Sequence, residues 1–312
     1  MRLEDEIAAQ NPGLEVPRGL ISHFSGVKTR HMAPVSEQPS DLAVAAARRV
    51  LTRTGTGPEQ VDLLVYAGVC IDAIEPATAH IVSAKLGLGC RVLDIRNACN
   101  SVCDAIDLAD SFIATGRHRK VLIACGETST VMMPRTVADH QAYKDAAAAY
   151  TLSDAGAALL LEAGTEPGLL VRLFMAHSAV WDAAAVPLVR GPEGLRTNGF
   201  TVDGRRLGMA FTRFDPRCFT DALAGAGLSW DDVAAVCIHQ AALPALWPIC
   251  DYFGIAKDKV VVSIADHGNV ASVTLLLQLA QAIGTGCVKR GDVVALIGLG
   301  SGISASLMVF RW

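Results

Sequence analysis

The chain of 312 residues repeats its own pattern at an offset of 170 residues. In each half, short apolar strand patterns alternate with helical patterns, which predicts an α/β unit with a mostly parallel sheet. Such self-similarity is typical of a duplicated structural unit. We expect the two units to pack about a pseudo-two-fold axis, so that equivalent turns meet at the centre. Four pairs of positions mark the register: Asp62 with Asp232, Val69 with His239, Cys99 with Asn269, and Gly116 with Gly286.

The repeat divides the chain into three parts. Residues 1–163 form an N-terminal half that contains Cys99, and residues 215–312 form a C-terminal half that contains His239 and Asn269. Residues 164–214 are a polar connection, rich in Gly and Pro, with a strand piece in LLVRLFMA. Periodicity does not resolve this connection or the irregular residues 127–150. In the C-terminal half we also expect a strand over 260–264 and a buried helix over 270–283.

Cys99 lies in a turn between a short apolar strand and an amphipathic helix. The strand ends at Ile95, and from Val102 onward apolar residues recur at helical spacing. Unpaired N–H groups and the helix dipole stabilise a thiolate at a helix N-terminus, so this position predicts an activated nucleophile. The alternative is an ordinary buried cysteine, since free cysteine is among the most buried residue types.

His239 and Asn269 complete a chemically sensible set with Cys99. His239 ends a strand, and Asn269 occupies the turn equivalent to that of Cys99. A histidine can accept a thiol proton or donate to a developing oxyanion. An asparagine NH₂ group can donate a second hydrogen bond to the same oxygen without adding charge.

A glycine-rich turn near the C-terminus is the candidate for the remaining part of an oxyanion hole. It reads Gly-Leu-Gly-Ser-Gly over residues 298–302. Glycines allow close backbone approach, so the N–H groups of Gly300, Ser301 and Gly302 could join that of Cys99 around an oxyanion. A glycine-rich turn or a lone histidine is by itself more often structural. Their coincidence with Cys99 under one duplication favours the functional interpretation.

Composition excludes several classes of protein. Apolar residues make up 51% of the chain and charged residues 19%, so a large core can form. The net charge of −4 gives no argument for nucleic-acid binding, and no apolar run reaches the roughly 18 residues of a membrane span. The N-terminus lacks the apolar core of a signal peptide. The nine cysteines are odd in number and include no CxxC pair, which predicts a reduced, cytoplasmic protein without a disulfide framework or metal site.

Four of these segments carry a resemblance to a known family. DIRNACNSV resembles the nucleophile turn of the β-ketoacyl-acyl-carrier-protein synthase III group of the thiolase superfamily. IHQA and HGNVAS resemble its histidine and asparagine motifs, and GLGSGISAS is similar to its C-terminal glycine loop. The resemblance covers roughly residues 24–312. Ala242 stands where the histidine motif usually has asparagine, which favours a specialised biosynthetic relative.

The resemblance implies the five-layer αβαβα thiolase fold, a homodimer, and no metal or redox cofactor. It also implies a ping-pong acyltransferase related to fatty acid or polyketide biosynthesis, with an acyl tunnel whose walls come from residues 127–150 and 164–214. An acyl thioester of CoA or of an acyl carrier protein would acylate Cys99. His239 and Asn269 would then support decarboxylation of a malonyl-type thioester, followed by Claisen condensation.

Two other functions remain open at this point. The acyl group could pass from Cys99 to a hydroxyl or amine acceptor, which would make an ester or amide without decarboxylation. Alternatively, the chain could be a non-catalytic partner subunit that keeps the fold, although the presence of Cys99, His239 and Asn269 argues against this.

Overall fold

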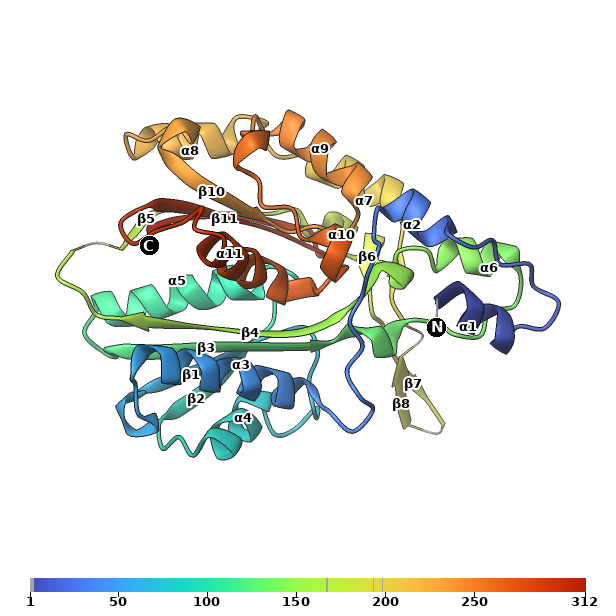
Figure 1. Ribbon diagram of the computed structural model, residues 1–312, viewed down its shortest axis with the longest axis horizontal. Helices are drawn as coiled ribbons and strands as arrows, with labels where there is room; N and C mark the ends of the chain where they lie inside the picture. Colours follow the sequence, from blue (N-terminus) through green and yellow to red (C-terminus); the bar gives the residue numbers. More distant parts are fainter. Residues whose placement is uncertain (1–2, 167, 193, 198) are drawn as a thin grey trace.

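Five layers make up the main body of the molecule. The computed structural model describes residues 3–166, 168–192, 194–197 and 199–312. Two β-sheets enclose a central pair of helices, and further helices cover the outer face of each sheet (Figure 1). This arrangement confirms the αβαβα fold expected from the sequence.

The first sheet is built by the N-terminal half. In spatial order the strands are β2 (Arg91–Ile95), β1 (Leu63–Ala67), β3 (Lys120–Thr128) and β4 (Asp154–Glu162). β1 pairs in parallel with both β2 and β3, and β4 pairs antiparallel with β3. Helices α3 (Pro39–Thr54) and α4 (Thr78–Leu86) pack on the outer face of this sheet.

The second sheet also has four strands, three of which repeat this pattern. In spatial order the strands are β10 (Val233–Ile238), β11 (Val293–Gly300), β12 (Ser304–Arg311) and β5 (Leu169–Ala176). β10 pairs in parallel with β11, and β12 pairs antiparallel with both β11 and β5. Helices α8 (Cys218–Gly225) and α9 (Leu243–Tyr252) cover its outer face.

The strand piece expected in LLVRLFMA is confirmed as β5, which pairs with β12 at the edge of the second sheet. One expectation about this half needs correction. The strand expected over residues 260–264 is reduced to a single bridge between Val260 and Val236. The strand does not form because the side chain of Gln240, in place of a neighbouring strand, bonds the backbone of Val261, Ser263 and Ile264. Ile264 then begins the short helix α10 (Ile264–His267).

The central layer consists of α5 (Ser101–Ala114) and α11 (Thr274–Gly284). Buried side chains of both helices join those of both sheets in one apolar cluster, which includes Ile106 and Leu276. A 3-10 turn over Ala271–Val273 precedes α11, so the helix expected from residue 270 begins four residues later. Burial between the two sheets explains why α11 and the inner face of α5 are so apolar. No helix in the described ranges is long and apolar enough to cross a membrane.

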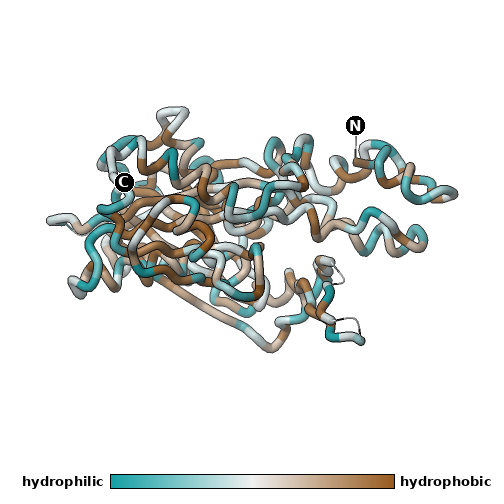
Figure 2. The backbone as a smooth tube through the Cα atoms, turned by 90° about the horizontal axis from the view of Figure 1, so that it is seen from below, coloured by the Kyte–Doolittle hydropathy of each residue, from teal (hydrophilic) through white to brown (hydrophobic). Residues whose placement is uncertain are grey.

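The remaining elements gather at one end of the layered body (Figure 1). Figure 2 shows that hydrophobic segments concentrate in the body, while the N-terminal end extends away from it. The elements at this end are α1 (Leu3–Gln10), α2 (Leu20–Ser25), α6 (His140–Asp145), α7 (Gly204–Phe211), β6 (Ala184–Ala185), β7 (Leu188–Gly191), β8 (Gly194–Thr197) and β9 (Thr201–Val202). Among them, α1, α2 and α6 meet in a small apolar cluster around Ile7, Ile21 and Tyr150.

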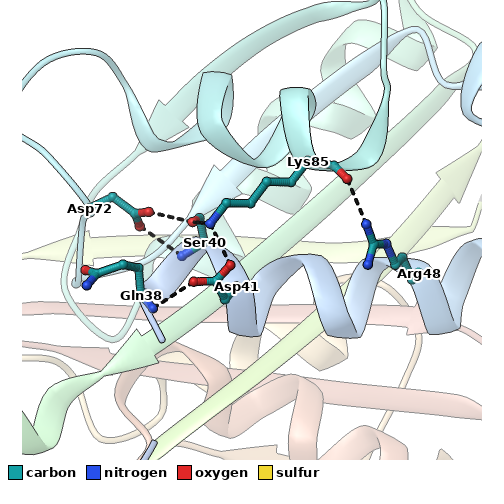
Figure 3. Close-up of polar contacts among 6 residues, drawn as sticks. All are labelled: Gln38, Ser40, Asp41, Arg48, Asp72 and Lys85. Carbon is teal, nitrogen blue, oxygen red and sulfur yellow. Dashed lines mark hydrogen bonds and ion pairs between the residues drawn. The ribbon is translucent and has the colours of Figure 1, made fainter. Parts of the chain in front are cut away.

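The loop over residues 68–77, between β1 and α4, is fastened to the first turn of α3 (Figure 3). The carboxylate of Asp72 accepts hydrogen bonds from the backbone N–H of Ser40 at 2.9 Å and from its hydroxyl at 2.5 Å. Lys85 Nζ donates to Ser40 Oγ at 2.7 Å and to Asp41 Oδ1 at 2.6 Å. A carboxylate at a helix N-terminus satisfies unpaired N–H groups there, so this loop is held to the outer layer.

A pair of glycines lets α3 lie directly on β3 and β4. Gly126 faces Gly156 across the two strands. A β-carbon at Gly126 would lie 1.9 Å from the carbonyl oxygen of Pro39, and one at Gly156 would lie 2.2 Å from that of Leu42. These neighbours are helix backbone atoms, which cannot move aside as a flexible side chain can. Only glycine therefore fits at both positions.

We predict that Gly126→Ala lowers the free energy of unfolding by about 1–3 kcal/mol, because α3 must lift from the sheet to admit a methyl group. Urea denaturation of the purified protein measures this change. Gly208→Ala in α7 is the matched control, since a β-carbon there meets no atom within 4 Å. Equal stability of the two variants would contradict the proposed close packing.

Candidate active site

Cys99 lies at the tip of a tight turn between β2 and α5. The turn closes through hydrogen bonds from Asn100 N to Asn97 O at 3.0 Å and from Ser101 Oγ to Ala98 O at 2.7 Å. Ala98 has a left-handed backbone with φ of 49°, which is costly for a residue with a β-carbon. This conformation presents the half-buried Cys99 side chain at the end of the central layer.

The thiol of Cys99 is not activated in the way that the sequence suggested. Asn100 is the N-cap and Ser101 the first helical residue, so Cys99 lies next to the helix N-terminus, as expected. Burial and the negative charge of Glu127 raise the pKa of Cys99 to about 12. Both effects oppose the thiolate expected at the helix end and favour the neutral thiol in the free protein.

The Cys99 turn packs against the glycine segment of the C-terminal half. Asn100 Nδ2 donates to Ser304 Oγ at 3.2 Å, and Ser306 Oγ donates to Asn100 Oδ1 at 2.5 Å. A β-carbon at Gly298 would collide with Asn100 Oδ1, and one at Gly300 would lie 3.2 Å from the carbonyl oxygen of Asn97. The missing side chains of these glycines are thus what allows the two halves to touch here.

The glycine segment is partly strand, contrary to the turn expected over residues 298–302. Gly298 and Gly300 are the last residues of β11, and the turn itself begins at Ser301. Ser301 and Gly302 are partly exposed beside the Cys99 turn, and Gly302 has a φ of 122° that favours glycine.

The backbone and carboxamide oxygen of Asn269 are held by the protein. Its N–H donates to Thr151 O at 2.8 Å, and its carbonyl accepts from Ser153 N at 2.9 Å. Asn269 Oδ1 accepts from the backbone N–H of Ala271 at 3.0 Å. Within the described residues, no hydrogen bond uses the side-chain NH₂ group of Asn269, so both of its N–H bonds remain for a substrate oxygen.

His239 directly follows β10, and its backbone N–H donates to Ile297 O of β11 at 3.0 Å. Burial lowers the pKa of its imidazole to about 4, and hydrogen bonding to the backbone of Ala271 opposes this shift only in part. Nδ1 is buried with no hydrogen-bond partner among the described residues. The imidazole is therefore neutral near pH 7 and has one nitrogen that accepts and one that donates.

These contacts bring the three sequence-predicted turns into one neighbourhood. The Cys99 turn touches the end of β11, His239 is bonded to the same strand, and Ala271 contacts both His239 and Asn269. The grouping follows from the duplication, since equivalent turns of two related halves meet where the halves pack.

Sequence analysis missed the buried groups behind this site. Glu127, at the end of β3, is fully buried, and Ser272 Oγ donates to its Oε1. The available signal was an acidic residue that closes the apolar strand VLIAC. In the described residues, no three His, Cys, Asp or Glu side chains are placed to bind a metal ion.

Two protein-family models match the chain. The model described as 3-oxoacyl-[acyl-carrier-protein (ACP)] synthase III matches residues 93–178. The model described as 3-oxoacyl-[acyl-carrier-protein (ACP)] synthase III C terminal matches residues 223–312. Together they cover more than half of the chain and include Cys99, His239 and Asn269.

Solved structures of similar proteins share the fold along the whole length. FabH, a 3-oxoacyl-(acyl carrier protein) synthase III from Pseudomonas aeruginosa PAO1, is 26% identical, with a TM-score of 0.84 over 99% of this chain and 93% of that chain. An OleA variant from Xanthomonas campestris with bound lauric acid and lauroyl-CoA is 24% identical, with a TM-score of 0.87 over 99% and 93%. Cerulenin-bound OleA is also 24% identical, with a TM-score of 0.84 over 99% and 91%. Given the two family models, this chain belongs to the 3-oxoacyl-[acyl-carrier-protein] synthase III family of the thiolase superfamily.

Proposed function

We propose that this chain is a condensing acyltransferase of the β-ketoacyl synthase III type, in which Cys99, His239 and Asn269 carry the chemistry. An acyl thioester acylates Cys99, and the acyl group then condenses with a malonyl-type thioester. The observation that supports this most directly is the meeting of the three turns, in which the NH₂ group of Asn269 has no hydrogen-bond partner among the described residues.

In the first half-reaction, the Cys99 sulfur attacks the carbonyl carbon of the incoming thioester. The neutral imidazole of His239 accepts the thiol proton as the C–S bond forms. The negative oxygen of the tetrahedral intermediate accepts hydrogen bonds from backbone N–H groups of Cys99 and of the Gly300–Gly302 segment. When the old C–S bond breaks, His239 returns the proton to the departing CoA or carrier thiol.

In the second half-reaction, the malonyl-type thioester loses its carboxylate as CO₂. The electron pair of the broken C–C bond moves into an enolate, whose oxygen accepts hydrogen bonds from Asn269 Nδ2 and from the neutral imidazole. The enolate carbon then attacks the acyl-Cys99 carbonyl, a new C–C bond forms, and the C–S bond to Cys99 breaks. Cys99 leaves as a thiolate, which takes a proton from solvent and returns to the neutral thiol. Neutral donors suit this step because they stabilise the enolate oxygen but, unlike a cation, do not hinder loss of the malonyl carboxylate as CO₂.

The acyl donor is a thioester of CoA or of an acyl carrier protein. The family name includes an acyl carrier protein, and the OleA variant binds lauroyl-CoA. A medium-length acyl-CoA is therefore the first donor to test. None of the steps above requires a metal or redox cofactor.

We predict that the protein gains one acyl group when mixed with lauroyl-CoA, and that Cys99→Ala abolishes this adduct. Intact-protein mass spectrometry measures the gain. Cys287→Ala, which removes the exposed cysteine, is the control and should still be acylated. An adduct that persists in Cys99→Ala would reject Cys99 as the nucleophile, and no adduct in the wild type would favour a non-catalytic subunit.

Asn269→Asp is expected to separate the two half-reactions. The aspartate keeps an oxygen for the Ala271 N–H but replaces the NH₂ donor, so CO₂ release from malonyl-CoA should fall by about 10²–10³-fold. Acylation of Cys99 should persist, which serves as the internal control. Wild-type acylation without any CO₂ release would instead favour transfer to a hydroxyl or amine acceptor.

We also propose that the protein forms a homodimer through β2, the edge strand of the first sheet. Its apolar side chains, such as Val92 and Ile95, remain partly exposed although they belong to core-forming patterns. Antiparallel pairing with a second copy would satisfy this edge and extend the sheet. Sedimentation velocity should give twice the monomer mass at micromolar concentration, and a monomer at all concentrations would rule this out.

A further inference from the structure

Glu127 is a fully buried carboxyl group next to the candidate site. It stands at the end of β3, and no Lys, Arg or His forms an ion pair with it in the described ranges. Burying a carboxyl group without a counter-ion is costly. A buried carboxyl group without an ion-pair partner in the described ranges therefore suggests a role beyond filling space.

Hydrogen-bond donors from two distant segments converge on this carboxyl group. The backbone N–H of Val69 donates to Oε1 at 2.8 Å, and that of Cys70 donates to Oε2 at 3.0 Å. The Ser272 hydroxyl also donates to Oε1. Three donors favour the ionised form and oppose the effect of burial, which raises the pKa of Glu127.

Through Ser272, the carboxylate connects the two halves at the turn that bears Asn269. Ser272 lies in the 3-10 turn that follows Asn269, and its hydroxyl also contacts Cys125 Sγ of β3 at 2.8 Å. Val69 and Cys70 begin the loop over 68–77, whose other side Asp72 fastens to α3. Glu127 thus fixes the Asn269 turn to a loop that is itself anchored.

Glu127 also acts electrostatically on its neighbours. The titratable groups that face it are Tyr66 of β1, Cys70 of the following loop, Cys125 of β3 and Cys99. Its negative charge adds to burial in raising the pKa of each of these side chains. A negative charge behind Cys99 favours the thiol over the thiolate until a proton acceptor and a substrate are in place.

We propose that Glu127 is a positioning residue for acyl transfer, which holds the Asn269 turn through Ser272 and places a negative charge behind Cys99. This inference rests on the proposed function for its catalytic consequence. Its electrostatic part can be measured without that function, because alkylation of Cys99 requires only a thiolate.

Glu127→Gln is the first test. A carboxamide has only one oxygen, so one of the two backbone N–H groups loses its acceptor and the Asn269 turn loosens. The negative charge is lost as well. We expect the pH midpoint for alkylation of Cys99 by iodoacetamide to fall by about one unit, which corresponds to about tenfold faster alkylation at pH 8. Malonyl-CoA decarboxylation should slow by about 10–100-fold.

Alkylation of Cys99 becomes faster while decarboxylation becomes slower. A residue that merely supports the fold would not produce both changes. Asp94→Asn is the matched control, because Asp94 accepts hydrogen bonds from two backbone N–H groups, of Thr78 and Ala79, on the outer side of the sheet. It should leave the Cys99 alkylation profile unchanged. Circular dichroism and thermal unfolding establish that each variant is folded.

Ser272→Ala provides a second, gentler test that keeps the charge. It should slow decarboxylation while leaving the alkylation midpoint of Cys99 within a few tenths of a unit of the wild type. Should Glu127→Gln fail to fold, this split between rate and midpoint decides the question. The proposal is overturned if both variants decarboxylate malonyl-CoA within twofold of the wild-type rate and Glu127→Gln leaves the alkylation midpoint of Cys99 unchanged. Wild-type protein that releases no CO₂ rejects the condensation reaction alone, and the alkylation profiles still report on Glu127.

Discussion

Packing of α5 against α11 between the two sheets positions the groups of the candidate site. α11 is apolar along nearly its whole length, while α5 buries one apolar face and carries its aspartates on the other. Burial of these apolar faces is favourable at about 1.5–3 kcal/mol for each large side chain removed from water. Because the helices lie side by side, the turns that precede them meet as well. One of these turns carries Cys99 and the other carries Asn269, so hydrophobic packing in the core determines which polar groups share a site.

Much of this arrangement could be predicted from the sequence, because a duplication constrains two halves at once. The offset that aligned Asp62 with Asp232 placed the starts of β1 and β10 correctly, and the αβαβα fold is confirmed. Local patterns were less informative where tertiary contacts decide the outcome. The strand expected over 260–264 is only a single bridge before α10. The strand pattern of β5 is visible in the connecting segment, but its pairing with β12 is not. The short helices and strands at the end of the body that holds the N-terminus have too few residues to show a clear hydrophobic period.

The state of Cys99 shows the same limit at the level of chemistry. Proximity to a helix N-terminus is visible in the sequence and favours a thiolate. Burial and the charge of Glu127, which comes from a different strand, act in the opposite direction and prevail. With the pKa of Cys99 at about 12 and that of His239 at about 4, a resting ion pair between them is strongly disfavoured. The site therefore rests as two neutral groups, and proton transfer has to accompany attack on the substrate.

The adjacent residues Gly126 and Glu127 join the outer layer to the site through one strand. Side chains alternate across a sheet, so the vacancy at Gly126 faces the backbone of α3 while the carboxylate of Glu127 faces the central layer. A slip of β3 by a single position would exchange them, pressing a charged side chain into a helix backbone and leaving nothing behind the nucleophile. Both faces of β3 therefore specify its register. A β3 paired one position out of register would be destabilised by a steric clash on one face and by hydrogen-bond donors without an acceptor on the other.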